Sequence, residues 1–347
     1  MRTSRSSWLG RVMVLMLLGL AAGPAYGGFS LPGYDLQVVQ SQQSVSHGAA
    51  SFQANGLWSS TDLGVPTDTS FVLPSCQGIV FSRLYLDIWG GTNAYTAQVS
   101  ATLNGVSLGT VAVGGTGNSG ATYSTTQTSV YGSGSGVWQV AYAGLGDTSI
   151  GALLHTNGTA NALSFTITDP ADQFDGRVYS ATLVTIYTDP SIAGNLDYYL
   201  AEADGTLRRT PGTSGAPAER RLSISGLNTD NVTSAQYIAS YTHGTAGQRD
   251  QAYLNGVALG GSGNDVAIGA MGAYGPDVPT FDVTGLLAAD STIRYSVADG
   301  DLGGAGESIL RANIGLLTVN HAVPEPATMA LLAIGLAALT KRRRTRQ

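Results

Sequence analysis

A seven-residue motif that occurs twice constrains the fold of this chain more than any other feature. Leu103–Gly109 reads LNGVSLG, and Leu254–Gly260 reads LNGVALG 151 residues later, with six of the seven positions identical. Three further pairs of similar segments keep their order along the chain: Phe71–Leu73 with Leu222–Ile224, Phe165–Asp169 with Tyr295–Asp299, and Ala181–Tyr187 with Ala312–Thr318. A shared order favours duplication over coincidence between two hairpins. We therefore predict two homologous units, residues 50–190 and 191–322, preceded by a lead segment over residues 28–49.

Each unit is predicted to be an antiparallel, jelly-roll-like β-sandwich, which makes the fold class all-β. Residues 84–89, 162–168 and 182–188 alternate with a period of two and are rich in β-branched and aromatic types. An Asn-Gly pair lies inside each copy of the repeated motif, and this dipeptide is the strongest short-range hairpin signal. The Gly-, Ser- and Thr-rich stretch 114–136 is predicted to be a long exposed loop.

Composition and charge exclude several classes of protein. Charged residues make up 12% of the chain, against roughly 25% in typical soluble domains. Cys76 is the single cysteine, which excludes a disulfide scaffold. Residues 28–323 hold nine arginines, no lysine and 22 acidic residues, a net charge of −13 that argues against nucleic acid as a partner. The 43% apolar content argues against disorder of the whole chain.

The first 27 residues have the three parts of a secretory signal peptide. Basic residues precede a short apolar run over residues 12–22, and Ala25 and Gly27 supply small residues for cleavage by signal peptidase. The alternative is an N-terminal membrane anchor, although the run is short for a span of about 20 residues.

The C-terminal segment, residues 323–347, also has three parts. Val323-Pro324-Glu325-Pro326 precedes an apolar helix predicted over residues 327–340, and a basic tail follows, formed by Lys341, Arg342, Arg343, Arg344 and Arg346. This order resembles the PEP-CTERM sorting signal of Gram-negative bacteria. The resemblance implies cleavage near Pro-Glu-Pro by an exosortase, after transient residence in the inner membrane, and delivery to the cell surface, outer envelope or extracellular matrix. Basic residues at the end of an apolar helix stay cytoplasmic and stop transfer. The alternative is a tail anchor that is never processed.

The body has a second, looser resemblance. Residues 181–191 and 196–202 are similar to an uncharacterised domain of surface-exposed proteins from methanogens and some bacteria. That resemblance implies a β architecture at the cell surface and carries over no activity.

Motifs of enzymes are absent from the sequence. It contains no HExxH, no Gly-x-Ser-x-Gly and no P-loop, so we expect no enzyme and assign no catalytic residue. Two carboxylates at a suitable separation would be enough for a secreted polysaccharide hydrolase, and sequence spacing leaves that alternative open.

Two loops carry clusters of acidic residues that are candidate calcium ligands, the one cofactor considered. They are Asp169, Asp172 and Asp175 in the first unit, and Asp299, Asp301 and Glu307 in the second. Calcium prefers several oxygen ligands from a flexible loop, but neither cluster has EF-hand spacing, and acidic residues are ordinary in exposed turns.

Aromatic side chains are the candidates for carbohydrate contact. Trp89 and Trp138 lie in strand patterns and are expected in the core, whereas Trp58 precedes a polar stretch and is predicted to be an exposed platform. The sequence therefore predicts an exported structural or adhesive protein of the cell surface or exopolysaccharide matrix. The alternative is a module that binds carbohydrate or a surface partner, with or without calcium.

Overall fold

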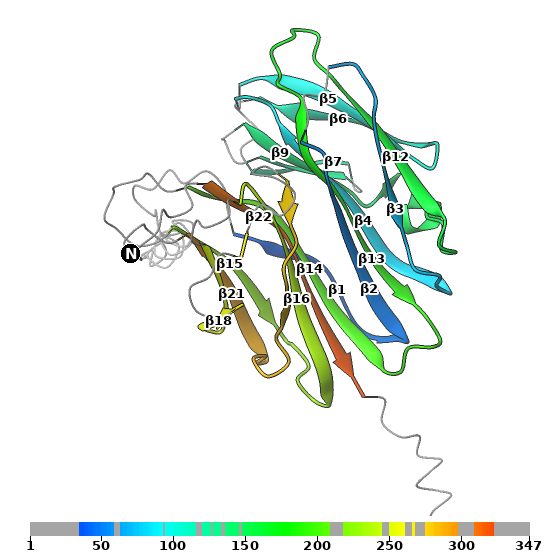
Figure 1. Ribbon diagram of the computed structural model, residues 1–347, viewed down its shortest axis with the longest axis vertical. Coiled ribbons are helices and arrows are strands. Elements are labelled where there is room, and N and C mark those ends of the chain that lie inside the picture. Colours follow the sequence, from blue (N-terminus) through cyan, green and yellow to red (C-terminus); the bar gives the residue numbers. More distant parts are fainter. Residues whose placement is uncertain are drawn as a thin grey trace, which may run out of the picture. The chain divides into compact units, whose positions relative to one another are not determined.

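The structure is a computed structural model that describes residues 35–58, 63–92, 94–115, 120–125, 128–132, 136–145, 148–208, 218–244, 250–260, 266–267, 275–297 and 309–322. All of these residues belong to one compact unit, which is built mainly from antiparallel β-sheets (Figure 1). The all-β prediction is confirmed. The predicted signal peptide, sorting motif, C-terminal helix and basic tail lie outside the described residues. Across the described ranges, the structure contains no helix with the length and apolar content needed to cross a membrane.

The first half of the chain forms a sandwich of two sheets. The first outer sheet has the order β3 (Thr67–Val72), β12 (Ala160–Thr168), β5 (Thr96–Leu103), β6 (Val106–Gly114). The first inner sheet has the order β2 (Gly48–Gly56), β13 (Arg177–Thr188), β4 (Gly78–Trp89), β9 (Val137–Tyr142), β8 (Thr128–Gly132), β7 (Gly120–Thr125). Alternate residues of the two sheets, such as Leu84, Val99 and Phe165, are buried in one core.

The second half contributes another pair of sheets. The second inner sheet has the order β1 (Gln37–Ser46), β14 (Asn195–Arg208), β22 (Ile309–His321), β16 (Val232–Thr242), β19 (Pro276–Asp277), and β20 (Thr280–Asp282) also pairs with β16. The second outer sheet has the order β15 (Ala218–Ser225), β21 (Asp290–Val297), β17 (Asp250–Leu254), β18 (Val257–Leu259). Strand β1 falls in the predicted lead segment, yet it pairs with β14 of the second half.

Strand order in the second half repeats that of the first. Orders β3-β12-β5-β6 and β15-β21-β17-β18 correspond, as do β2-β13-β4-β9 and β14-β22-β16-β20. The repeated motif forms the same hairpin in both halves, since Asn104 and Asn255 both have φ 51° and a positive-φ glycine follows each. Residues in this left-handed region suit the tight two-residue turns that join twisted strands.

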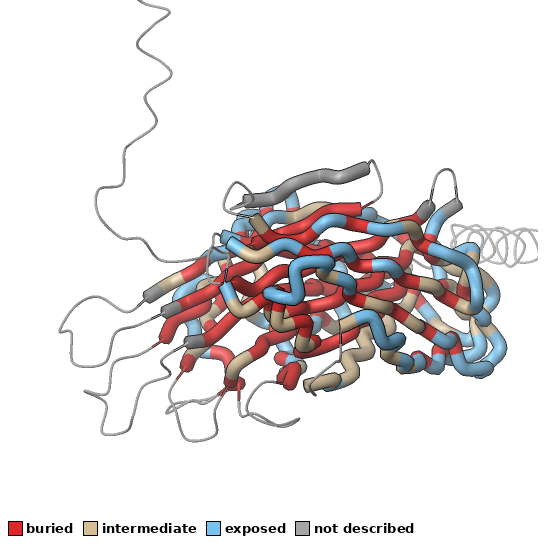
Figure 2. The backbone as a smooth tube through the Cα atoms, turned by 90° about the horizontal axis from the view of Figure 1, so that it is seen from above, coloured by how far each residue is buried: buried red, intermediate tan, exposed pale blue. Residues whose placement is uncertain are grey.

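The two inner sheets pack against each other. One apolar cluster joins Val184 and Ile186 of β13 to Leu200 of β14 and Leu316 of β22. Figure 2 shows that buried residues follow the strands, with exposed residues at the turns and margins. Each inner sheet is therefore covered on one face by its outer sheet and on the opposite face by the other inner sheet.

The predicted long loop over residues 114–136 is wrong in part, because this stretch contains strands β7 and β8. They pair with each other, and β8 pairs with β9, which extends the first inner sheet. Val130 and Tyr131 of β8 are buried. Their burial depends on neighbouring strands, so a local Gly/Ser/Thr composition does not reveal it.

Candidate functional site

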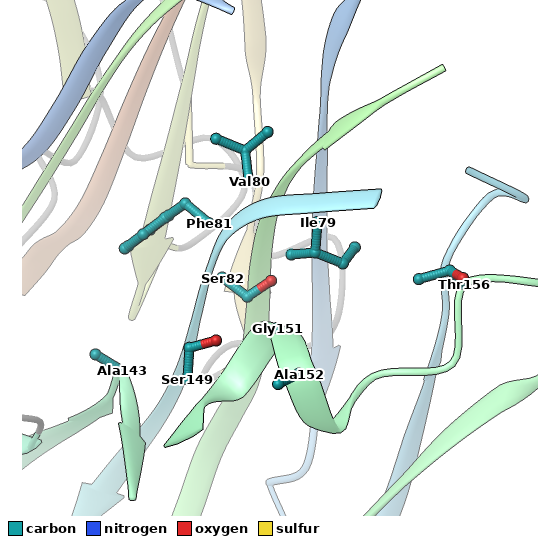
Figure 3. A pocket seen from close by; sticks show the side chains of 9 residues that line it. All are labelled: Ile79, Val80, Phe81, Ser82, Ala143, Ser149, Gly151, Ala152 and Thr156. Carbon is teal, nitrogen blue, oxygen red and sulfur yellow. The ribbon is translucent and has the colours of Figure 1, made fainter. Parts of the chain in front are cut away.

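A pocket of about 500 Å³ opens where β4 begins (Figure 3). Its lining comes from the start of β4, from the end of β11 (Thr148–Ser149), which pairs with β10 (Gly144–Leu145), and from the 3-10 helix η1 (Ile150–Leu153). The lining residues are Ile79, Val80, Phe81, Ser82, Ala143, Ser149, Gly151, Ala152 and Thr156.

A β-bulge shapes one wall of this pocket. Ile186 is paired with Phe81, whereas the next residue, Tyr187, is paired with Ile79, so Val80 is the extra residue. Bulges bend a strand and redirect its side chains. Ile79 consequently packs against the core of the first sandwich, while Phe81 packs against the cluster between the inner sheets.

A glycine lets η1 approach this wall closely. A Cβ atom at Gly151 would lie 2.6 Å from Cγ2 of Ile79, closer than real Cβ contacts allow. The bond from Ile150 N to Ala143 O, at 2.9 Å, ties the start of the helix to the residue after β9, and Leu154 N caps its end by donating to Gly151 O at 3.3 Å. The pocket thus depends on a close contact between two segments that are distant in sequence, at Ile79 and Gly151.

Hydroxyl groups and apolar carbon atoms make up the chemistry of the lining. Ser82, Ser149 and Thr156 provide the hydroxyls, and no lining residue carries an ionisable side chain. The Ser82 hydroxyl donates to Oγ1 of Thr185 at 3.2 Å. Figure 3 shows the Ser149 hydroxyl directed toward Gly151, with the Phe81 ring pointing away from the Ser82 and Ser149 hydroxyls. Such a lining can hydrogen-bond a neutral ligand, but its side chains include no general acid or base of the usual kinds.

Trp58 does not form the open platform that the sequence predicts. The residue is half-buried, and its ring stacks on Tyr179 with 4.7 Å between ring centroids and 15° between planes. The Arg177 guanidinium also lies over the Trp58 ring, 4.7 Å from its centroid. Neighbouring side chains therefore already use the aromatic surface on which a sugar would stack. Trp138 is buried, as predicted, whereas Trp89, also expected in the core, is half-buried at the end of β4.

The first predicted calcium cluster is engaged in its own loop. Asp169 accepts hydrogen bonds from the backbone N–H groups of Ala171, Gln173 and Phe174 at 2.7–2.8 Å, and these bonds hold the pKa of Asp169 below its usual range. Asp175 accepts from Arg177, with 2.6 Å between Oδ2 and Nη2. Neither these two residues nor Asp172 belongs to a metal-binding group. Among the described residues, no three His, Cys, Asp or Glu side chains are grouped to hold a metal ion. Asp299, Asp301 and Glu307 lie outside the described residues.

Charged groups are instead buried between the two inner sheets. The Arg83 side chain of β4 forms an ion pair with Glu202 of β14, with 2.7 Å between Nε and Oε2. Tyr131 also donates to Glu202, and Arg83 donates to Ser129 at 3.2 Å. Both partners of a buried pair must be hydrogen-bonded to offset the loss of water, and these contacts meet that need.

A second buried polar group lies near the first. Asp87 of β4 accepts hydrogen bonds from Ser180, Gln139 and Asn313 at 2.7–3.2 Å. Its neighbour Arg311 pairs with Asp204 at 2.6 Å, and both side chains are fully buried. Burial raises the pKa of Asp87, and the charge of Arg311 opposes that rise. Because Asn313 belongs to β22, these contacts tie the first half to the second.

Sequence reasoning did not identify the pocket or the buried charges. The pocket combines residues from 79 to 156, and no local motif links them. Arg83 and Asp87 alternate with Leu84 and Leu86, a pattern typical of one buried and one solvent-facing side. The absence of lysine from residues 28–323 was the available hint, because every basic side chain there is then an arginine, whose planar guanidinium suits buried ion pairs.

The predicted sorting and cleavage residues lie outside the described ranges: Ala25, Gly27, Val323, Pro324, Glu325, Pro326, Lys341, Arg342, Arg343, Arg344 and Arg346. The fold nevertheless fixes where the sorting segment starts. Strand β22 ends at His321, and the following residue, Ala322, donates its N–H to Asn231 O at 3.0 Å.

Two family models match the sequence. One, described as "Protein of unknown function (DUF3344)", matches residues 27–319, and the other, described as "PEP-CTERM protein-sorting motif", matches residues 322–344. The predicted PEP-CTERM signal is confirmed. No curated protein sequence matches the chain.

Several solved structures are distantly similar. They include PNGF-II (10% identity, 80% of this chain and 66% of that chain, TM-score 0.26). A second is a beta-porphyranase of glycoside hydrolase family 86 from the human gut bacterium Bacteroides plebeius (11% identity, 76% of this chain and 38% of that chain, TM-score 0.26). A third is the recombinant peptide: N-glycanase F (12% identity, 80% of this chain and 96% of that chain, TM-score 0.26). The chain spans less than two thirds of the length of the first two. Likeness at this level carries no argument about activity.

Proposed function

The chain belongs to the family described as "Protein of unknown function (DUF3344)", a description without an activity, so we propose its role from its sorting motif and its architecture. The PEP-CTERM motif indicates export and association with the envelope or surface of a Gram-negative bacterium, with processing by an exosortase. Our proposal is a structural or adhesive protein of the cell surface or exopolysaccharide matrix.

One observation carries this proposal: the sorting motif begins at residue 322, directly after the last residue of β22. Cleavage near Pro324-Glu325-Pro326 would therefore leave every strand of the second inner sheet intact. In the proposed sequence of events, signal peptidase cuts near Ala25 and Gly27, the apolar segment 327–340 holds the chain in the inner membrane, and the exosortase then trims it.

The architecture supports a structural role. Matching strand orders in the two halves support a duplicated sandwich unit, and the buried ion pair Arg83–Glu202 and an apolar interface join the halves. A protein whose inner sheets are covered on both faces keeps the apolar side chains of those sheets away from water and from other chains.

A second candidate function is the binding of carbohydrate or of a surface partner. The pocket beside η1 favours it, because hydroxyl and apolar groups line a concave site. Calcium assistance would depend on Asp299, Asp301 and Glu307, and a secreted hydrolase is the third candidate.

An epitope tag in the exposed turn at residues 64–66 tests the sorting proposal, since these residues lie far from the motif in sequence. We expect a shortened, tagged product outside the inner membrane in cells with exosortase. Full-length protein should accumulate in the membrane in cells without the enzyme, or when Pro324, Glu325 and Pro326 are all changed to Ala. Full-length, membrane-bound protein in both strains would refute the proposal.

A further inference from the structure

We propose that the pocket between β4 and η1 binds one uncharged sugar residue of a neutral glycan. This inference rests on the proposed role at the surface or in the matrix, and it names the chemical class that the protein would hold there.

The absence of charge in the lining determines the class of ligand. Residues 28–323 carry 22 acidic side chains and nine arginines, yet none of them is among the nine lining residues. A uronate or sulfate group entering the pocket would meet no cation there, in a chain whose net charge is already negative. An amine would meet no carboxylate in the lining. A neutral ligand avoids the cost of burying a charge that has no partner in the site.

The lining also matches the two kinds of surface that a sugar ring presents. Hydroxyls of Ser149 and Thr156 can exchange hydrogen bonds with ring hydroxyls, whereas Ser82, whose proton goes to Thr185, can only accept one. The side chains of Ile79, Ala143 and Ala152 supply apolar carbon for C–H groups. The pocket volume of about 500 Å³ lies within the range of small-molecule sites, roughly 300–1,000 Å³.

Backbone hydrogen bonds hold the walls in place before any ligand binds. Ile150 N donates to Ala143 O at 2.9 Å, and Cys76 N donates to Thr156 O at 2.9 Å. These bonds fix η1 and the segment that carries Thr156 against the first inner sheet. A site that is already ordered loses little conformational entropy on binding.

Ala152 is the position from which the pocket can be filled without disturbing the core, because it is exposed on η1. We expect Ala152→Trp to weaken binding of neutral oligosaccharides at least tenfold, and Ser149→Ala to weaken it severalfold. Ala112→Trp is the matched control, since Ala112 is exposed on β6 and does not line the pocket. It should leave binding unchanged, and all three variants should keep the wild-type melting temperature.

The measurement is titration calorimetry with the chain expressed at full length and purified in the form that cells export. The probes are neutral tetrasaccharides of glucose, galactose and mannose, with a hexuronate tetrasaccharide as the charged comparison. Saturable binding of a neutral probe that is weakened in Ala152→Trp, less so in Ser149→Ala and not at all in Ala112→Trp supports the proposal. Absence of binding to every neutral probe, equal loss in Ala112→Trp, or equally tight hexuronate binding overturns it. The tag assay described above reads export separately, so an exported protein that binds no neutral probe refutes this inference and leaves the proposed function standing.

Discussion

Removing one partner of the buried Arg83–Glu202 pair should destabilise the protein far more than removing a surface charge. In Arg83→Met, the Glu202 carboxylate keeps Tyr131 as a donor but loses the guanidinium. The Glu202 side chain is 0% exposed and that of Arg83 is 11% exposed, so water cannot replace the lost partner without separating the inner sheets.

The expected cost follows from this geometry. Uncompensated burial of one charge after its partner is removed costs about 3–5 kcal/mol. The pair Arg221–Glu219 provides the control, because the Arg221 side chain is 60% exposed and the closest N–O distance is 3.4 Å. Arg221→Met should therefore cost about 1 kcal/mol or less. The double change Arg83→Met with Glu202→Leu removes both buried charges and should recover most of the loss.

Urea denaturation, followed by far-UV circular dichroism, gives five free energies of unfolding: those of the wild type, Arg83→Met, Glu202→Leu, the double variant and Arg221→Met. The reasoning is refuted if Arg83→Met costs no more than Arg221→Met. It is also refuted if the double change is as destabilising as the two single changes added together, because burial of an unpaired charge would then not be the cause.

Three further predictions concern other contacts. Burial, assisted by Arg311, lowers the pKa of His243 to about 3, below its unfolded value of roughly 6.5. Between pH 8 and pH 5, His243 therefore takes up a proton in the unfolded state but stays neutral in the folded state. This difference lowers the free energy of unfolding by about 2 kcal/mol at pH 5 relative to pH 8. His243→Asn, which tolerates the φ of 71°, should flatten the acid side of the stability–pH curve, and an unchanged difference between wild type and variant across pH would contradict this. The Gln53 side chain hydrogen-bonds both the N–H and the C=O of Val72, so Gln53→Ala should lower the free energy of unfolding by about 1–2 kcal/mol. Thermal denaturation measures this loss, and the control Gln98→Ala, at an exposed position, should lose less than about 0.5 kcal/mol. Asn104→Ala and Asn255→Ala should each lower the free energy of unfolding by about 2 kcal/mol, because each asparagine has φ 51° and its side chain accepts a hydrogen bond from a backbone N–H on the neighbouring strand. Clearly unequal losses would argue against equivalent hairpins.

Local sequence signals predicted the strands and the hairpins well. The Asn-Gly pairs form the turns between β5 and β6 and between β17 and β18, as predicted. This prediction succeeded because the geometry of a two-residue turn depends on the turn residues themselves. The all-β class follows from alternation that is also local. These features depend on neighbours in sequence, which a sequence displays directly.

The parts that sequence could not predict depend on contacts between distant strands. The Arg83 and Asp87 side of β4 is buried because the second inner sheet covers it, and nothing near residue 83 encodes that sheet. The pocket similarly needs the bulge at Val80, the glycine at position 151 and Thr156 in one place. Trp58 was a reasonable platform candidate by position, but its stacking partner, Tyr179, lies on a strand more than a hundred residues later.

The position of β22 sets the order in which the protein can be completed. It lies between β14 and β16 in the second inner sheet, although it is the last described strand of the chain. During N-to-C secretion, β1 must wait for β14, and the sheet keeps a gap until residues 309–321 have crossed the membrane. Pairing over such long sequence separations is slow. The sorting segment, which follows β22 directly, would tether the chain while β22 is inserted between β14 and β16. The moment at which the exosortase cuts would then also set the time available for folding.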